Sequence, residues 1–189
     1  MKKYRLTKFA IILTGLSIVA CEQKEVKNYL PESNGPLNEV IVVADTDILD
    51  GTAGDALKSY LSQRQLGLGV DEAKYTIRHL TPDLFKGAIM RSRSVVYMEL
   101  DTLYRAHVKK DMYATPQHLV VIKGRNELEL SQSVDQIMLQ AVDSFRQSDL
   151  RVAQSRFKRS LYTEPRLNTT FGIDLTIPSI YLLFHHTFD

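Results

Sequence analysis

The chain has 189 residues, 44% hydrophobic and 24% charged, a composition typical of one globular domain and not of a disordered or membrane-embedded protein. Its formal charge of +2 depends on Lys2, Lys3, Arg5 and Lys8 at the amino terminus, because the remaining 20 basic and 22 acidic residues carry a net charge of −2. The composition therefore gives no support to a nucleic-acid partner. A single cysteine excludes an intramolecular disulfide.

The amino terminus has the organisation of a signal peptide. Residues 1–8 are basic, and an apolar run of 12 residues follows from Phe9 to Ala20. A membrane-spanning helix needs about 20 apolar residues, whereas this run is closed by Cys21 and four polar residues. We predict that residues 1–20 target the chain for export and are then removed.

The tetrapeptide Ile18-Val19-Ala20-Cys21 resembles a lipobox, the signal after which a lipoprotein signal peptidase leaves a lipidated cysteine at the new amino terminus. We predict that Cys21 carries the lipid and that two or three acyl chains, such as palmitate, hold the protein on a membrane. The alternative is a buried cysteine that merely follows an apolar stretch. The lipidated cysteine and a polar tether, rich in proline, asparagine and glycine, occupy residues 21–37.

The remaining residues, 38–189, are predicted to form a single domain. Hydrophobic periodicity predicts a strand over Glu39–Ala44, a helix over Thr52–Arg64, a strand over Lys74–Leu80 and a short helix from Pro82. Two further strands are predicted over Ser94–Leu100 and His118–Lys123. A long helix follows, capped by Asn126, interrupted near Ser148 and ending at Phe157, and the last predicted strand covers Thr170–Ile177. This order is not the regular alternation of a doubly wound parallel sheet. We therefore predict an α+β two-layer sandwich, with helices packed on one face of a largely antiparallel sheet.

Several segments carry a family resemblance. Residues 30–35 (Leu-Pro-Glu-Ser-Asn-Gly), the strand from Asn38 to Val43, Gly54-Asp55-Ala56-Leu57, and Ala114-Thr115-Pro116-Gln117 before the strand Leu119–Ile122 resemble a family of Gram-negative envelope lipoproteins whose shared domain has no assigned function. The resemblance covers residues 29–177 and implies an envelope lipoprotein, expected on the outer membrane, with the periplasmic or surface leaflet left open. It transfers no functional residues. Family members continue beyond Pro178, so the apolar run Ile180–Phe184 is either an interrupted strand in a truncated product or a tail that packs on its own core.

Asp45-Thr46-Asp47 after the first strand resembles the aspartate pair of haloacid dehalogenase phosphotransferases, in which one carboxylate attacks phosphorus and both hold magnesium. The expected threonine is replaced by Leu49, and no further metal ligands follow. The same residues fail as a calcium loop, because Leu49 and Ala56 stand where oxygen ligands belong. We interpret Asp45, Asp47 and Asp50 as turn and helix-cap residues.

The other candidate sites are weaker. None of the five histidines, His79, His107, His118, His185 and His186, has a partner at metal-ligand spacing on a helix, so no metal and no cofactor are predicted. Gly67-Leu68-Gly69 is too short for a phosphate loop and is interpreted as a turn. The basic residues near the carboxyl end of the long helix interact favourably with the negative end of its dipole.

Arg91 and Arg93 precede a strand and could bind an anionic glycan or lipid headgroup with their planar guanidinium groups. The alternative is that they are solvated residues at the edge of the strand.

Two classes of function are compatible with the sequence. The first is a non-enzymatic envelope lipoprotein that binds or scaffolds an envelope protein or glycan; the second is an envelope hydrolase acting on peptidoglycan, glycan or lipid. We favour the first, because no nucleophile with a base is evident, and a concave site gathering Asp45, Asp47, Arg91 or His118 would favour the second.

Overall fold

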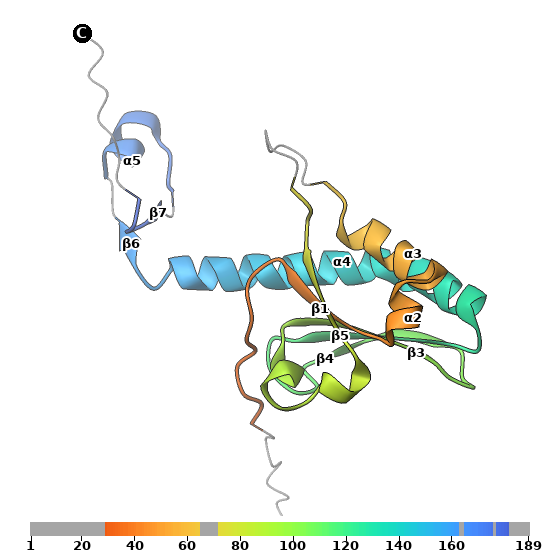
Figure 1. Ribbon diagram of the computed structural model, residues 1–189. Helices are drawn as coiled ribbons and strands as arrows, with labels where there is room; N and C mark the ends of the chain where they lie inside the picture. The colour runs from red at the N-terminus through yellow and green to blue at the C-terminus, as the bar shows by residue number, and fades with distance from the viewer. Residues whose placement is uncertain (1–28, 65–71, 163–164, 176, 182–189) are drawn as a thin grey trace, which may run out of the picture.

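The computed structural model describes residues 29–64, 72–162, 165–175 and 177–181. These residues form a body built on a five-stranded sheet and a smaller carboxy-terminal arm, residues 158–181, which projects from the end of a long helix (Figure 1). The predicted signal peptide, Cys21, the turn at Gly67 and Gly69, and the histidine pair His185 and His186 all fall outside the described residues.

The sheet is mixed. Its strands are β1 (Glu39–Val43), β2 (Thr76–Leu80), β3 (Ser94–Leu100), β4 (Arg105–Lys110) and β5 (His118–Gly124), arranged in the order β2-β1-β3-β5-β4. The pairs β1–β2, β1–β3 and β3–β5 are parallel, and only β4 runs antiparallel, against β5. The α+β class is confirmed, whereas the largely antiparallel pairing is wrong.

Two connections explain the parallel pairing. The chain crosses from β2 to β3 through two 3-10 turns, Pro82–Leu84 and Gly87–Arg91, and not through a regular helix, so the alternation typical of parallel sheets is disguised in the sequence. The strand β4, which the sequence analysis missed, reverses the chain between β3 and β5. Because β4 occupies the edge, β3 and β5 can pair in parallel along Ser94–Leu100 and His118–Gly124.

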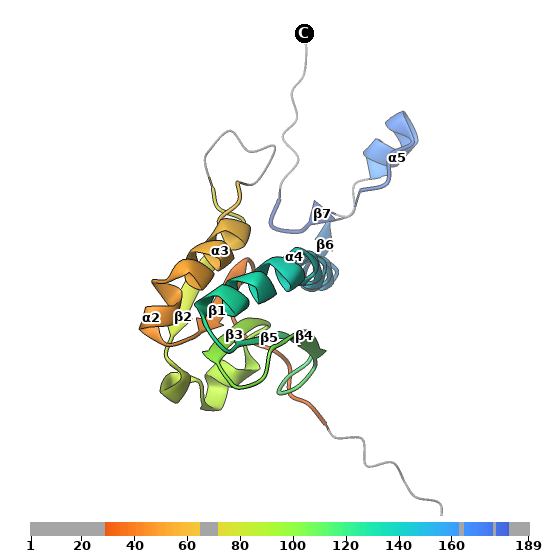
Figure 2. The ribbon, with the colours of Figure 1, turned by 90° about the vertical axis from the view of Figure 1, so that its right-hand side faces the viewer.

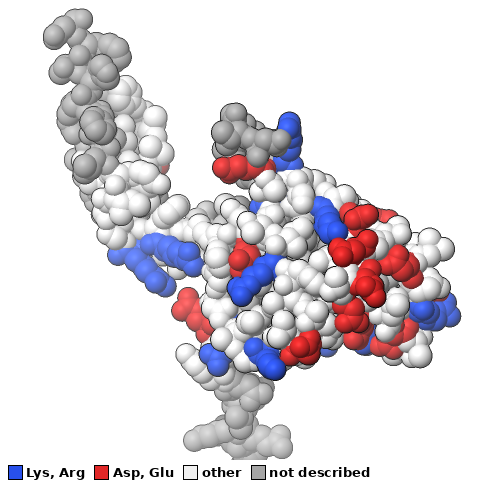
Figure 3. Space-filling model, in the orientation of Figure 1, with Lys and Arg blue, Asp and Glu red and all other residues white. Residues whose placement is uncertain are grey.

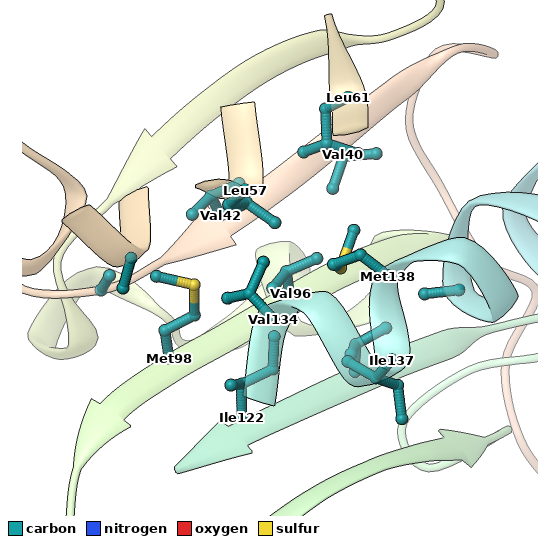
Figure 4. Close-up of a cluster of buried hydrophobic side chains, with 14 of the residues drawn as sticks. Val40, Val42, Leu57, Leu61, Val96, Met98, Ile122, Val134, Ile137 and Met138 are labelled. Carbon is teal, nitrogen blue, oxygen red and sulfur yellow. The ribbon is translucent and has the colours of Figure 1, made fainter. Parts of the chain in front are cut away.

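Three α-helices, α2 (Thr46–Leu49), α3 (Thr52–Leu61) and α4 (Glu127–Phe157), pack on one face of the sheet. Alternate strand residues point to them, since side chains of a strand alternate between its two faces. Figure 4 shows the resulting core, in which side chains from three strands meet two helices: Val40, Val42, Val96, Met98, Ile122, Leu57, Leu61, Val134, Ile137 and Met138. The glycine at position 54 allows α2 to approach α3, because a Cβ there would lie 1.9 Å from the Leu49 carbonyl oxygen.

The opposite face of the sheet is covered by the 3-10 turns and loops. Ile41, Val43, Val95 and Leu119 form its buried centre. Two aromatic contacts hold these turns and loops against the sheet. The centroid of the Phe85 ring lies 6.2 Å from that of Tyr97 and 6.3 Å from that of Tyr113. Burial is the first cause that raises the pKa of Tyr97 above its usual value.

Helix α4 is continuous over 31 residues, about 46 Å at 1.5 Å per residue. Asn126 caps it as predicted, since its side chain accepts a hydrogen bond from the Glu129 amide at 2.9 Å. The predicted interruption near Ser148 is wrong, because Ser148 and Asp149 are buried against the body instead of ending the helix. The carboxy-terminal end of α4 runs past the sheet (Figure 1). Among the described helices, none is long and apolar enough to cross a membrane.

The arm differs from the predicted strand over Thr170–Ile177. It contains α5 (Pro165–Phe171) and a two-residue pairing of β6 (Leu161–Tyr162) with β7 (Ile177–Pro178). Proline suits the first position of a helix, and Gly172, with φ of 65°, takes the left-handed conformation that ends one. Ile180 and Tyr181, the described part of the predicted tail strand, are 82% and 59% exposed.

Candidate functional site

The aspartates that follow β1 lie on the surface at the carboxyl end of the sheet. Asp45 precedes α2, but its side chain makes no hydrogen bond to the amides of that helix. Asp45 and Asp50 flank α2 in the turn that follows β1, but their interpretation as side-chain caps is wrong. Glu127 of α4 serves α3 instead: the Thr52 amide donates to Glu127 Oε2 at 3.1 Å. The glycine at position 51 makes room, since a Cβ there would lie 2.1 Å from Glu127 Oε1.

The basic and histidine candidates lie at the other end of the sheet. In the parallel register Ile41 pairs with Val95 and Ser94 with His118, so Arg93 and His118 stand where β3 and β5 begin, whereas Asp45 follows the end of β1. Arg91 is exposed beside them. The structure therefore does not bring Asp45 and Asp47 together with Arg91 or His118 in one concave site.

Arg93 is neither a ligand-binding arginine on the surface nor a solvated edge residue. Its side chain is 4% exposed, and its Nη1 donates to Asp149 Oδ1 at 3.2 Å and to the Pro36 carbonyl at 3.1 Å. The other carboxylate oxygen of Asp149 accepts from the Asn38 amide at 3.1 Å. This ion pair joins the start of β3, the second half of α4 and the segment before β1.

The last part of the predicted tether is attached to the body. The Ser33 amide donates to the Thr115 carbonyl, the Thr115 amide donates to the Pro31 carbonyl, and the Arg93 amide donates to the Asn34 carbonyl. Residues from Pro31 onward are thus part of the domain, seven residues before the predicted start at 38. The ten residues from Cys21 to Leu30 span at most about 35 Å when fully extended.

The histidines of the described chain have structural environments. His79 Nε2 is 2.9 Å from the Ala44 carbonyl oxygen, and the His118 ring lies 6.4 Å from that of Phe145. Burial is the first cause that lowers the pKa of His118. His118 Nδ1, Ser94 Oγ and Ser148 Oγ are buried without a hydrogen-bond partner. Within the part of the chain that the structure describes, no group of three or more histidine, cysteine or acidic residues could hold a metal ion.

A groove with a volume of about 600 Å³ lies between α4 and the segments that end α3 and begin β2. Its floor includes Tyr75, which is 5% exposed and whose hydroxyl donates to the Val142 carbonyl at 3.4 Å. Burial is the main cause that raises the pKa of Tyr75 far above its usual value. Lys74 and Arg146 line it with positive charge, and Lys74 donates to Gln63 at 2.8 Å. The other lining residues are Leu37, Asn38, Leu139, Asp143, Asp149, Leu150 and Ala153.

Helix α4 carries a second apolar stripe, separate from the core-facing one, and two of its residues, Leu139 and Leu150, line the groove. It consists of Leu128, Leu139, Leu150 and Phe157, which are 68%, 68%, 51% and 42% exposed. The three leucines are spaced by 11 residues, about three helical turns, so they project to nearly the same side. We call these four residues the α4 stripe. The sequence does not reveal this stripe readily, because the core positions dominate the helical periodicity, although its repeat of 11 residues is a signal for it.

Residues 33–158 match a family model described as "Domain of unknown function (DUF8532)". The matched segment is 126 of the 189 residues and includes the whole sheet, the groove and α4. The chain belongs to this family. The DUF8532 match begins at Ser33, within the segment attached to the body, and ends at Lys158, the first residue of the arm. No curated protein and no solved structure matches the chain.

Proposed function

We propose that this DUF8532 chain is a lipid-anchored lipoprotein of the cell envelope, held on the outer membrane through Cys21, whose domain binds another envelope component and does not act as a catalyst. The anchor is supported by the order of basic segment, apolar segment, small residue and cysteine. The domain starts at Pro31, close enough to Cys21 that this end of the anchored body would remain within about 35 Å of the lipid surface.

The α4 stripe beside the groove is the observation that carries the binding role. Leu139 and Leu150 line the groove and expose more than half of their side-chain surface to water. Covering apolar surface stabilises a complex by about 25 cal/mol per Å² before the costs of association. A row of such side chains next to a concave surface is therefore typical of a docking site.

The alternative function, an envelope hydrolase acting on peptidoglycan, glycan or lipid, receives less support. Hydrolysis by carboxylates or by a histidine-activated nucleophile needs those groups within hydrogen-bond reach of one another. Here Asp45 and Asp47 lie at the opposite end of the sheet from His118, and His118 is buried beneath α4.

Lipidation is tested by Cys21→Ser in cells fed a fatty-acid analogue. The hydroxyl cannot form the thioether, so we expect complete loss of label and release of the protein from the membrane fraction. Ser17→Ala, in the same apolar segment, is the control and should keep the label. Label that persists on the Cys21→Ser variant would contradict the lipoprotein proposal.

The docking role is tested by chemical crosslinking of the full-length protein in intact cells. Leu139→Ser combined with Leu150→Ser should remove crosslinked species that the wild type forms. Leu103→Ser is a matched control, because Leu103 is also exposed, at 56%, but lies in the turn between β3 and β4. Adducts that survive in the double variant would show that the groove is not the docking site, and turnover of glycan or lipid substrates by the purified protein would favour the hydrolase.

A further inference from the structure

We propose that the component docked on the α4 stripe is a second copy of this chain, paired antiparallel along α4 about a two-fold axis between residues 144 and 145. The inference rests on the proposed function, since it names the partner of the same groove. It is carried by the spacing of the exposed residues, by the distribution of charge along α4 and by the space beside this helix.

The spacing of four groove residues is symmetric about one point. In an antiparallel pair centred between residues 144 and 145, Leu139 lies opposite Leu150 of the second copy, and Asp143 lies opposite Arg146 of the second copy. Both pairs occur twice, as a two-fold interface requires. All four residues line the groove. Each apolar side chain thus meets an apolar one, and each charge meets its opposite.

Charge along the whole of α4 favours the same orientation. Before the proposed axis α4 carries four acidic residues, Glu127, Glu129, Asp135 and Asp143. After the axis it carries Arg146 and Arg156, while Arg151 lies on another side of the helix and Asp149 is already neutralised by Arg93. Figure 3 shows acidic side chains gathered on the side where α4 begins and a basic group where α4 meets the arm. An antiparallel pair places each acidic half beside a basic half, whereas a parallel pair would place like charges together.

Arg146 is available for this contact. It makes no hydrogen bond or ion pair with any residue that the structure describes, and its side chain is exposed. Among the described residues, the opposing Asp143 accepts one hydrogen bond, an exposed one from Gln147 at 2.7 Å. A bond of this kind exchanges readily for a charged partner.

The space beside α4 fits a helix. Helix α3 lies along the first part of α4, where the Tyr60 hydroxyl donates to Asp135 at 3.0 Å, and ends at Leu61. In Figure 2 the two helices lie side by side above the sheet. Beyond the end of α3 the flank of α4 is the groove, and the end of α4 continues past the sheet (Figure 1). The second copy's α4 would continue the row of helices that α3 begins.

Charge reversal in the full-length chain, extracted from membranes in detergent, tests the pairing by sedimentation. Asp143→Arg and Arg146→Asp should each convert the dimer to monomer, because each creates two like-charge contacts across the axis. The double variant Asp143→Arg/Arg146→Asp restores opposite charges and should restore the dimer. Arg151→Asp is the control: it lies about 140° around the helix from Arg146 and should leave the dimer intact.

Disulfide trapping tests the register. Copies carrying Leu139→Cys, mixed with copies carrying Leu150→Cys, should form a crosslinked dimer on oxidation. Either variant alone should not, because its two cysteines would be about 16 Å apart along the helix, beyond disulfide reach.

Three results would overturn the proposal: a monomeric wild type, a dimer that ignores both charge reversals, or efficient crosslinking of Leu139→Cys with itself. The first of these, together with stripe-dependent crosslinks to a different protein, would remove the self-pairing and leave the proposed binding role standing. Loss of the Cys21 label or of all stripe-dependent crosslinks would instead remove the proposed function.

Discussion

The two ends of the parallel strands use the same chemical groups in different surroundings. At the amino ends, Arg93 and Asp149 form an ion pair with side chains that are 4% and 8% exposed. At the carboxyl ends, Lys123 contacts both Glu99 and Asp101, with side chains between 25% and 32% exposed. Water can screen the contacts of Lys123 but not the buried pair of Arg93 and Asp149, so the two groups contribute very differently to stability.

The two ends of the parallel strands also differ in the sites that they form. Ligands of open parallel sheets usually bind at the carboxyl ends of the strands. Here that edge holds exposed carboxylates and the contact of Glu127 with the start of α3. The groove instead lies near the amino ends, where Asn38 precedes β1 and Tyr75 precedes β2. The buried ion pair lies directly beside it, through Asp149, and fixes the wall on which the α4 stripe is carried.

Arg93→Ala is expected to have the largest effect. It leaves Asp149 buried without its cation and removes the hydrogen bond to Pro36, so the free energy of unfolding should fall by about 3–5 kcal/mol. Urea denaturation of the full chain measures the loss. Arg93→Met combined with Asp149→Leu removes both charges and should recover most of it. A loss below about 1 kcal/mol in Arg93→Ala would mean that the two ends of the sheet are equivalent.

Acidification should weaken the amino end through His118. Its pKa is lowered by burial first and by Lys110 and Arg151 among its neighbours, while Asp111 and Asp149 act in the opposite sense. Below the ordinary pKa of 6.5 the unfolded chain therefore binds more protons than the folded one, and stability falls as the pH decreases from there through the lowered pKa.

His118→Gln should reduce this pH dependence, measured as the change in unfolding free energy between pH 7 and pH 5. His107, whose pKa burial also lowers, remains in the variant and should leave a smaller slope. If His118→Gln left the pH dependence of the unfolding free energy unchanged, groups other than His118 would cause the loss of stability in acid.

At the carboxyl end, Glu127→Ala should cost about 1 kcal/mol, the usual contribution of a side chain that accepts from a helix amino terminus. Asp47→Ala is the matched control, because the carboxylate of Asp47 is exposed and makes no hydrogen bond with the described residues. It should leave the melting temperature nearly unchanged. The opposite ranking of the two variants would restore the aspartates as caps.

Much of the fold was predictable, because the signals are local. The β-branched runs of β1, β3 and β5 and the periodicity of α4, with its Asn126 cap, identify these elements at nearly the observed positions. The pairing direction was not predictable, since it depends on connections that are not helices and on β4, a strand with only weak alternation. Local sequence does not encode which strands become neighbours.

The site was harder to predict than the fold. The polar residues Ser148 and Asp149 predict a helix interruption, although a carboxylate placed four residues after the core residue Phe145 faces the same side and so indicates a buried partner. That partner, Arg93, is 56 residues away in sequence. The groove is assembled from three separate segments, so only the repeat of 11 residues in the α4 stripe was visible beforehand.

Lys123→Met should have the smallest effect on stability and a clear effect on one titration. The hydrogen bond from Lys123 is the leading cause that lowers the pKa of Asp101 to about 2, with the bond from the Leu103 amide second. Removing the ammonium should raise the pKa of Asp101 toward its usual 3.8, and the bond from Leu103 should keep it slightly lower. Carboxyl chemical shifts followed by NMR between pH 2 and pH 6 measure the pKa of Asp101.

Because the contacts of Lys123 are open to water, the melting temperature of Lys123→Met at neutral pH should change far less than that of Arg93→Ala. A comparable fall in both variants would show that the carboxyl end of the sheet supports the fold as strongly as the buried pair at the amino end.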